Sequence, residues 1–344
     1  MSINQSSLSE TESAERHTFA FRIAFAASIG FTLGYQLGWD FPFLPSLFAV
    51  QLLSARRSLD LKQAFGFVAL MAAGCVFSLM IALIFVDRPL NFIIIMGLVI
   101  FLEFLALARG QAAAGIFLIT TSFVPMMALS SLDLAYALVH DLIVGSILAL
   151  LLTFLAHALF PSHELAEQAD RRVPMESSPV GAALANAGVL MSLVIYFMGA
   201  GTPTSIIVIM VTAITILQQS AIAGRGAAIG LIVGNIAGGL AAAVAYLLVS
   251  LLPSPGFLLL VVLLFALIFG AKIAEGGDMA PIYTVGIATF LTVLGLGLSP
   301  LPQDSSTIFI SRVWTVVIAS LYTIGVASVL RGLFLGPVRG ISVS

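Results

Sequence analysis

Apolar residues follow one another along this chain in long blocks, which are interrupted by proline, glycine and charged residues. Most blocks hold about 17 to 30 residues, and a helix of that length crosses about 30 Å of hydrocarbon. The breaks between blocks predict twelve segments, at residues 19–38, 41–54, 63–86, 90–108, 112–131, 134–160, 179–199, 202–219, 226–252, 256–271, 280–298 and 305–335. The pattern therefore predicts an all-α polytopic membrane protein with about 12 transmembrane segments, two of them short or discontinuous.

Charge divides the chain into two halves of six segments. Residues 161–178 form the one interior stretch that is dense in charge, and we expect a cytosolic linker there. The first membrane repeat is expected at residues 19–160 and the second at 179–335. The polar residues 1–18 predict a disordered cytosolic tail, and residues 336–344 a second cytosolic tail.

The two halves share a pattern of breaks. Each has a long first segment and a short second segment that starts at a turn of proline with serine or threonine, and each fourth segment follows a proline, Pro89 or Pro255. Because six is an even number, both halves have the same orientation in the membrane. This indicates a parallel repeat about an axis along the membrane normal.

Composition narrows the functions that are open to the chain. Only 9% of the residues are charged and 60% are hydrophobic, whereas about a quarter of the residues in soluble domains are charged. No stretch is long and polar enough for a soluble catalytic domain, and no P-loop or H-E-x-x-H motif occurs, so we expect no enzyme. A net charge of −2 without a basic patch argues against nucleic acid. One cysteine and four scattered histidines predict no metal and no cofactor.

The basic residues orient the chain. With a cytosolic N-terminus, twelve of the fourteen Lys and Arg residues fall on the inner side, and only Arg88 and Arg312 fall outside. This is a strong positive-inside bias, and it predicts that both termini are cytosolic.

The short second segments are the first candidate for a binding site. Pro42–Ser54 would form roughly 20 Å of helix, too little to cross the bilayer alone. Short segments at matching positions are typical of the discontinuous helices of transporters, whose N-termini suit an anion. The alternative is a loop that enters the membrane for packing alone. The candidate substrate-binding residues are Pro42, Pro45, Ser46, Thr202, Pro203, Thr204 and Ser205.

Ionisable residues within the segments are the second candidate. Asp141 and Arg312 lie about seven residues into segments six and twelve, at the same depth of roughly 11 Å. They could form an ion pair or a substrate site shared by the halves, in which Arg312 binds substrate; the alternative is a structural salt bridge. His140 is also a candidate, although neighbours on a helix point about 100° apart.

Two further features lie inside predicted helices. Glu103, near the inner end of segment four, could carry protons or could anchor the helix end by pairing with Arg22 or Arg109. Segment nine carries glycines at a spacing of four residues, which predicts close helix packing, with Asn235 hydrogen-bonded across the interface. These glycines are Gly226, Gly230, Gly234 and Gly238.

Three stretches resemble a known family. They are residues 41–51 (FPFLPSLFAVQ), Arg225 with the Gly230/Gly234 stripe, and residues 312–322 (RVWTVVIASLY). The chain resembles, over nearly all its length, the fusaric acid resistance/aromatic acid exporter superfamily, in its short branch known only as a domain of unknown function. Larger members carry a cytosolic domain after each membrane half, and this chain has only a short linker and tail there.

The resemblance implies a function. Members of this superfamily are inner-membrane efflux components for small organic and aromatic acids, often working with a periplasmic adaptor of the membrane-fusion type. We therefore expect a multi-pass protein of the bacterial inner (plasma) membrane that exports small organic anions, driven by the proton gradient. The alternatives are a passive anion channel and a scaffold subunit of an efflux complex. Assembly into a homo-oligomer is left open.

The predicted topology can be tested by cysteine labelling in a Cys75→Ala background. Cysteines placed near Asp40, Asp87, Asp133, Gly201, Ser254 and Asp304 should react with an impermeant reagent from the periplasm. A cysteine at Arg172 should react only after the membrane is opened. Labelling of that cysteine in intact cells would contradict the topology.

Overall fold

The computed structural model describes residues 5–54, 60–111, 113–161, 179–200, 227–277 and 279–299. The helices in these ranges are α1 (Gln5–Gln36), α2 (Leu44–Ser54), α3 (Leu61–Phe85), α4 (Pro89–Ala108), α5 (Ala113–Ser130), α6 (Leu132–Leu159), α7 (Pro179–Ala200), α9 (Ala227–Leu251), α10 (Pro255–Glu275) and α11 (Ala280–Leu298). Among these residues, nine helices are long and apolar enough to cross a membrane, and α2 is a shorter apolar helix. The described part of the chain is thus that of an all-α polytopic membrane protein.

These helices correspond to ten of the predicted segments, with ends that differ by a few residues, except that α1 begins at Gln5 and not near residue 19. The two remaining segments, 202–219 and 305–335, lie outside the described residues. Residues 5–18, where the sequence predicts a cytosolic tail, are the first turns of α1 in the structure. This stretch contains glutamine, leucine, glutamate, alanine and arginine, which favour a helix. Because the apolar turns that follow are helical, these residues extend a helix and do not have to nucleate one.

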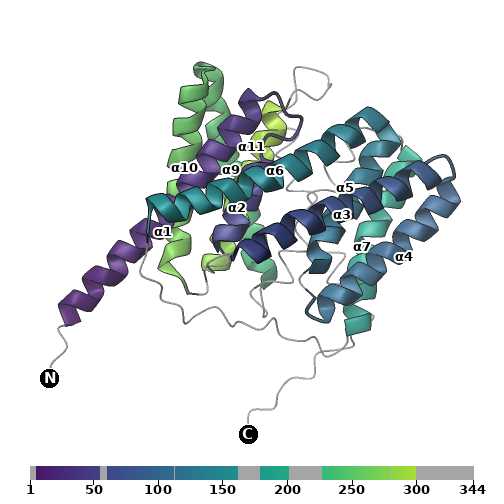
Figure 1. Ribbon diagram of the computed structural model, residues 1–344, viewed down its shortest axis with the longest axis horizontal. Helices are drawn as coiled ribbons and strands as arrows, with labels where there is room; N and C mark the ends of the chain where they lie inside the picture. Colours follow the sequence, from purple (N-terminus) through teal and green to yellow (C-terminus); the bar gives the residue numbers. More distant parts are fainter. Residues whose placement is uncertain are drawn as a thin grey trace, which may run out of the picture. The chain divides into compact units, whose positions relative to one another are not determined.

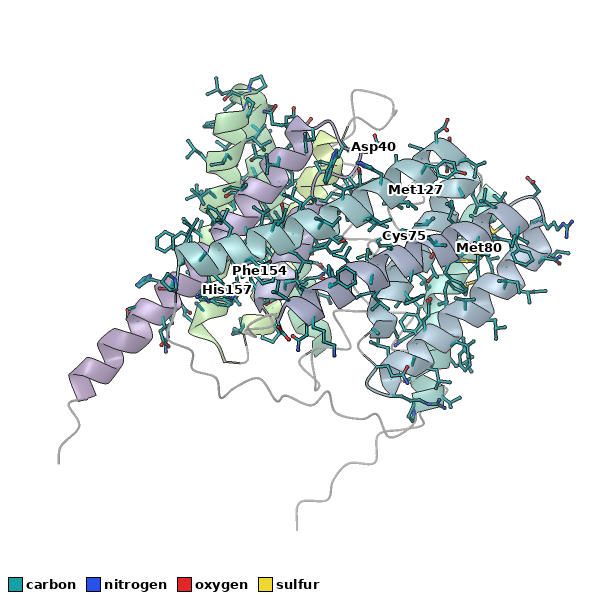
Figure 2. All side chains as sticks on the ribbon, viewed as in Figure 1. Asp40, Cys75, Met80, Met127, Phe154 and His157 are labelled. Atoms are coloured by element: carbon teal, nitrogen blue, oxygen red, sulfur yellow. The ribbon has the colours of Figure 1, made fainter. Side chains whose placement is uncertain are left out.

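Exposed apolar side chains form stripes at helical spacing. On α4 these are Leu90, Ile94, Leu98 and Leu102, and on α10 they are Leu260, Leu264 and Ile268. The opposite face of α4 is buried and carries Phe92, Met96, Ile100 and Phe104. Side chains along the helices are drawn mostly in the colour of carbon in Figure 2. Such stripes suit lipid, because water would be a poor solvent for so much contiguous apolar surface.

The described helices belong to two compact units. The first contains α1, α2, most of α6, nearly all of α9, and α10 and α11; the second contains most of α3, and α4, α5 and α7. In the first unit α1 packs against α10 and α2, and α10 packs against α11 (Figure 1). In the second unit α4 packs against α7 and α5. Each unit therefore draws helices from both of the halves that the sequence predicts.

Corresponding helices of the two halves have a constant spacing along the chain. The helices α3 and α9 end at Phe85 and Leu251, which are 166 residues apart, as are Pro89 and Pro255, where α4 and α10 begin. The contacts match as well: α1 packs on α10 in one unit, and α7 packs on α4 in the other.

Glycines of α9 allow it to approach α11 closely. A Cβ placed on Gly234 would lie 2.7 Å from the carbonyl oxygen of Ile282, and one on Gly238 would clash with the carbonyl oxygen of Gly286. Across the same interface the hydroxyl of Thr289 donates to Oδ1 of Asn235 at 2.5 Å. The predicted roles of Gly230, Gly234 and Gly238 in packing and of Asn235 in an interhelical hydrogen bond are confirmed; Gly226 lies outside the described residues.

We predict that Gly238→Ala destabilises the protein by about 1–3 kcal/mol, because the added methyl group overpacks the interface between α9 and α11. Gly66→Ala is the matched control, since a Cβ there meets nothing within 4 Å and alanine favours the helix by up to about 1 kcal/mol. Unfolding in detergent would measure both. Equal stability of the two variants would contradict the packing described.

Candidate functional site

The first candidate site lies where the chain passes from α1 to the short helix α2. At the end of α1 the N–H of Trp39 donates a hydrogen bond to the carbonyl oxygen of Gly34, and Gly38 has a φ of +71°. This left-handed conformation strains any residue with a Cβ, so glycine suits the turn. The helix α2 begins at Leu44 with Pro45 in its first turn, where the missing N–H of proline costs no helical bond.

All ten residues from 41 to 50 are buried. Glycines on α1, α6 and α11 make room for them. A Cβ on Gly34 would lie 2.5 Å from the carbonyl oxygen of Pro42, and one on Gly295 would lie 2.5 Å from the ring of Phe43. Gly145 of α6 is in van der Waals range of Leu44 and Pro45. The start of α2 is thus enclosed by other helices of the first unit.

Ser46 and the turn before it are tied to the helices around them. The Ser46 hydroxyl is fully buried and donates to the carbonyl of Ala27 on α1 at 2.8 Å. The hydroxyl of Ser299, just after α11, donates to the carbonyl of Asp40 at 2.6 Å. In this conformation the Ser46 hydroxyl therefore holds α2 against α1.

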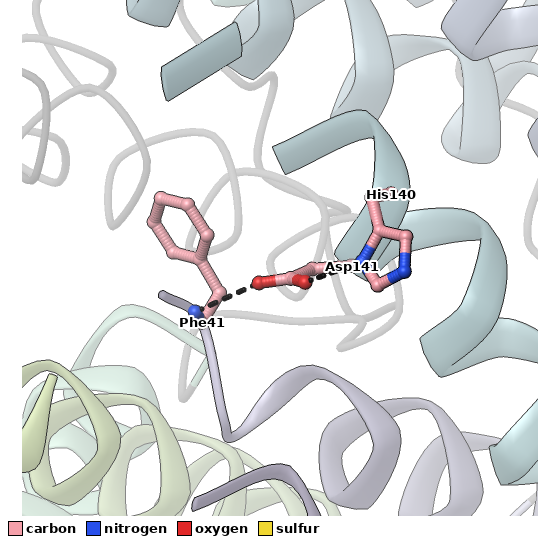
Figure 3. A network of polar contacts seen from close by, with 3 residues as sticks. All are labelled: Phe41, His140 and Asp141. Atoms are coloured by element: carbon pink, nitrogen blue, oxygen red, sulfur yellow. Dashed lines mark hydrogen bonds and ion pairs between the residues drawn. The ribbon is translucent and has the colours of Figure 1, made fainter. Parts of the chain in front are cut away.

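Asp141 of α6 anchors the same turn (Figure 3). Its side chain is buried, with 2% of the residue exposed, and its Oδ2 accepts a hydrogen bond from the N–H of Phe41 at 3.0 Å. Its Oδ1 lies 3.1 Å from Nδ1 of His140, whose side chain is 58% exposed. The ring of Trp39 meets that of His140 edge to face at 5.8 Å between centroids.

His140 therefore belongs to the Asp141 site, although the Cβ directions of neighbouring residues on a helix differ by about 100°. The two side chains still meet, because their rotamers bring Nδ1 of His140 and Oδ1 of Asp141 together. A protonated His140 would make this contact charge-assisted, which strengthens a hydrogen bond about twofold. The arrangement links an exposed titratable ring to the backbone that precedes α2.

The second candidate site is Glu103 of α4, in the second unit. It is 8% exposed, and the hydroxyl oxygen of Thr121 on α5 lies 2.9 Å from its Oε1 and 2.7 Å from its Oε2. Among the residues that the structure describes, the contact of Glu103 is thus with Thr121 rather than with Arg109, which is exposed at the end of α4. Thr121 does not stand out in the sequence; the signal for it is that it lies four residues before Pro125, next to a second threonine, Thr120.

The other candidates cannot be placed. Thr202, Pro203, Thr204, Ser205 and Arg312 lie outside the described residues, so the pairing of Asp141 with Arg312 stays a prediction. Within the described ranges, no three His, Cys, Asp or Glu side chains are grouped in a way that could hold a metal ion.

Comparison with known proteins gives one similarity. The family model described as a protein of unknown function (DUF2955) matches residues 19–156. No curated protein and no solved structure matches the chain. The matched residues run from the apolar part of α1 nearly to the end of α6, which is the span of the first predicted half.

We predict that Asp141→Leu destabilises the first unit by about 1–3 kcal/mol more than Asp141→Asn does, because leucine leaves the buried N–H of Phe41 without an acceptor. Asparagine keeps a carbonyl oxygen at that place. Asp133→Asn, an exposed position on the same helix, is the control. Unfolding in detergent would show the order, and an Asp141→Leu variant as stable as the control would contradict the anchoring role of Asp141.

Proposed function

We propose that this chain is a secondary transporter of the bacterial inner membrane that exports small organic acids, aromatic carboxylic acids in particular, driven by the proton gradient. It is proposed to act without enzymatic chemistry and without a cofactor. The observation that carries the proposal is the short helix α2, of 11 residues, which begins inside an apolar unit beside a buried carboxylate. Discontinuous helices that begin inside the membrane are typical of the substrate sites of transporters.

The substrate's carboxylate would be held at the starts of the two short segments. The positive end of the helix dipole favours an anion there without a nearby lysine. On α2, Pro42 and Pro45 shape the turn and Ser46 positions the helix through Ala27. Hydroxyl donors would come from Thr202, Thr204 and Ser205, with Pro203 setting the second turn, and Arg312 would add a positive charge.

Two parallel repeats of six segments complete the proposal. The equal spacing of 166 residues between the ends of α3 and α9 and between the starts of α4 and α10 supports a duplication. The matched contacts support it further, since the first helix of each half packs on the fourth helix of the other half. The family model match to residues 19–156 covers one such half. In transporters built from repeats, the binding site lies near the membrane midplane where the repeats meet.

The partners follow from the same proposal. The bilayer is the solvent of the described helices, and a small organic anion is the substrate. Both termini would be cytosolic. A periplasmic adaptor of the membrane-fusion type would carry the acid onward, and a homo-oligomer would be compatible with the exposed apolar stripes.

Counterflow in proteoliposomes tests the transport proposal. Vesicles loaded with an unlabelled aromatic acid should transiently accumulate the labelled acid, and an imposed pH gradient should change the steady-state level, because a carrier couples the two fluxes. Empty liposomes are the control. Flux of the acid without counterflow would indicate a channel and contradict a carrier.

The proposed recognition of the substrate's negative charge by Thr204 and Ser205 can be tested with an aromatic acid and its neutral amide. Thr204→Ala with Ser205→Ala should weaken binding of an aromatic acid by about tenfold, which corresponds to about 1.4 kcal/mol, while binding of its neutral amide changes little. Normal expression would show that assembly is intact. If the affinity for the acid and for the amide fell equally, these residues would shape the cavity without recognising the negative charge.

A further inference from the structure

Glu103 is a buried carboxyl group, and among the described residues no ionised side chain faces it from the helices that pack on α4. Of the helices described as packing on α4, α5 carries no ionisable side chain and α7 carries only Tyr196, which is 66% exposed. Glu103 lies between Ile100 and Phe104 on the buried face of α4, away from the stripe at Leu98 and Leu102. An ionisable residue in such a place is costly and is a functional candidate by default.

The hydrogen bonds around Glu103 can be satisfied in two ways. The hydroxyl of Thr121 is within bonding distance of Glu103 and also lies 2.8 Å from the carbonyl oxygen of Phe117. A hydroxyl has one proton to donate and can also accept. If Glu103 is protonated, it donates to Thr121, and Thr121 donates to Phe117. If Glu103 is ionised, Thr121 turns and donates to the carboxylate instead.

The carbonyl of Phe117 is satisfied in either state. The hydroxyl of Thr120 also donates to this oxygen, at 2.9 Å. When Thr121 turns toward Glu103, Phe117 keeps the hydrogen bond from Thr120 as well as its bond within the helix. The proton can thus leave and return without stranding a donor or an acceptor, which a buried site would otherwise make expensive.

The next turn of α5 supplies further polar groups. Pro125 has no N–H, so the backbone carbonyl of Thr121, four residues earlier, has no helical donor. The hydroxyl of Ser122, 1% exposed, has no hydrogen-bond partner among the described residues. A carbonyl without its regular helical donor and an unpartnered hydroxyl therefore lie beside the residue that contacts Glu103.

The matching interface of the other half is apolar. Phe269 follows Glu103 by 166 residues, the distance between the starts of α4 and α10. It lies against Phe290 of α11, with ring centroids 6.2 Å apart, and Phe265 lies 5.3 Å from the same ring. An interface of this kind can thus be packed with rings alone, so packing does not account for a carboxyl at Glu103.

We propose that Glu103 is the site that binds the coupling proton, and that Thr121 is a positioning residue whose hydroxyl turns to serve the protonated and the ionised forms in turn. This inference rests on the proposed function, because it names the place where the proton is bound during transport. The step is a reversible protonation of one carboxylate oxygen, with water on the accessible side as donor and acceptor of the proton.

Infrared difference spectroscopy of the reconstituted full chain tests the site without a substrate. During a pH titration the wild type should show the carboxylic C=O band of a buried protonated carboxyl, and Glu103→Gln should remove it. Glutamine imitates the protonated form and should fold, since its amide can donate to Thr121. Glu275→Gln, which changes an exposed glutamate paired with Lys272, is the control and should leave the band unchanged.

Variants of Thr121 test the hydroxyl. Thr121→Val should move the midpoint of the band by about one pH unit upward, because the ionised form loses a stronger hydrogen bond than the protonated form does. Thr121→Ser should restore the wild-type midpoint. A band that persists unchanged in Glu103→Gln would overturn the site, and an unmoved midpoint in Thr121→Val would overturn the role of Thr121.

Transport separates this inference from the proposed function. In Glu103→Gln, counterflow of the acid should continue while its response to a pH gradient is lost. If the wild type shows no counterflow of any acid but Glu103 titrates, the proposed function fails and the proton site stands. If counterflow in Glu103→Gln still responds fully to the pH gradient, the inference fails and the transport function stands.

Discussion

Lipid offers no hydrogen bonds, so each polar group at membrane depth must find its partner within the protein. The described helices meet this requirement at a few specific contacts. Asp141 accepts the N–H of Phe41 where the backbone leaves α1, and Ser46 donates to Ala27 where α2 begins. Without such contacts a helix that starts inside the apolar unit would strand its backbone groups, at a cost of several kcal/mol for each group. The position of α2, and with it the candidate anion site, depends on them.

The same requirement explains the use of small residues. Since lipid tails are as apolar as leucine, helices associate through close contact and hydrogen bonds rather than through the hydrophobic effect. Gly34 and Gly145 admit the turn before α2 and its first residues, and Gly238 brings α9 onto α11 close to the bond between Thr289 and Asn235. At Glu103 the contact is between a carboxyl and a hydroxyl, and its two alternative hydrogen-bond patterns make it suited to reversible protonation.

The helices could be predicted from the sequence because hydropathy and length decide membrane spans directly; Pro89 and Pro255 even marked two of the starts. The short α2 followed from its length, whereas its contacts did not, because they join Phe41 to a residue 100 positions away. The sequence makes His140 a candidate, but its contact with Asp141 could not be predicted, because periodicity gives Cβ directions and not rotamers. Thr121 was missed because hydroxyl groups in apolar helices commonly bond their own backbone, and only packing reveals a second partner.

The central claim is that binding of an organic acid is coupled to a proton on Glu103. Linkage makes this measurable in the purified protein, because a ligand that changes the affinity for protons must change the number bound. The direct measurement is the pH change in a weakly buffered detergent solution when a transported aromatic acid is added. If the two are coupled, the wild type takes up or releases protons and Glu103→Gln does not at equal occupancy. Binding of the acid with the same proton exchange in both proteins would contradict it.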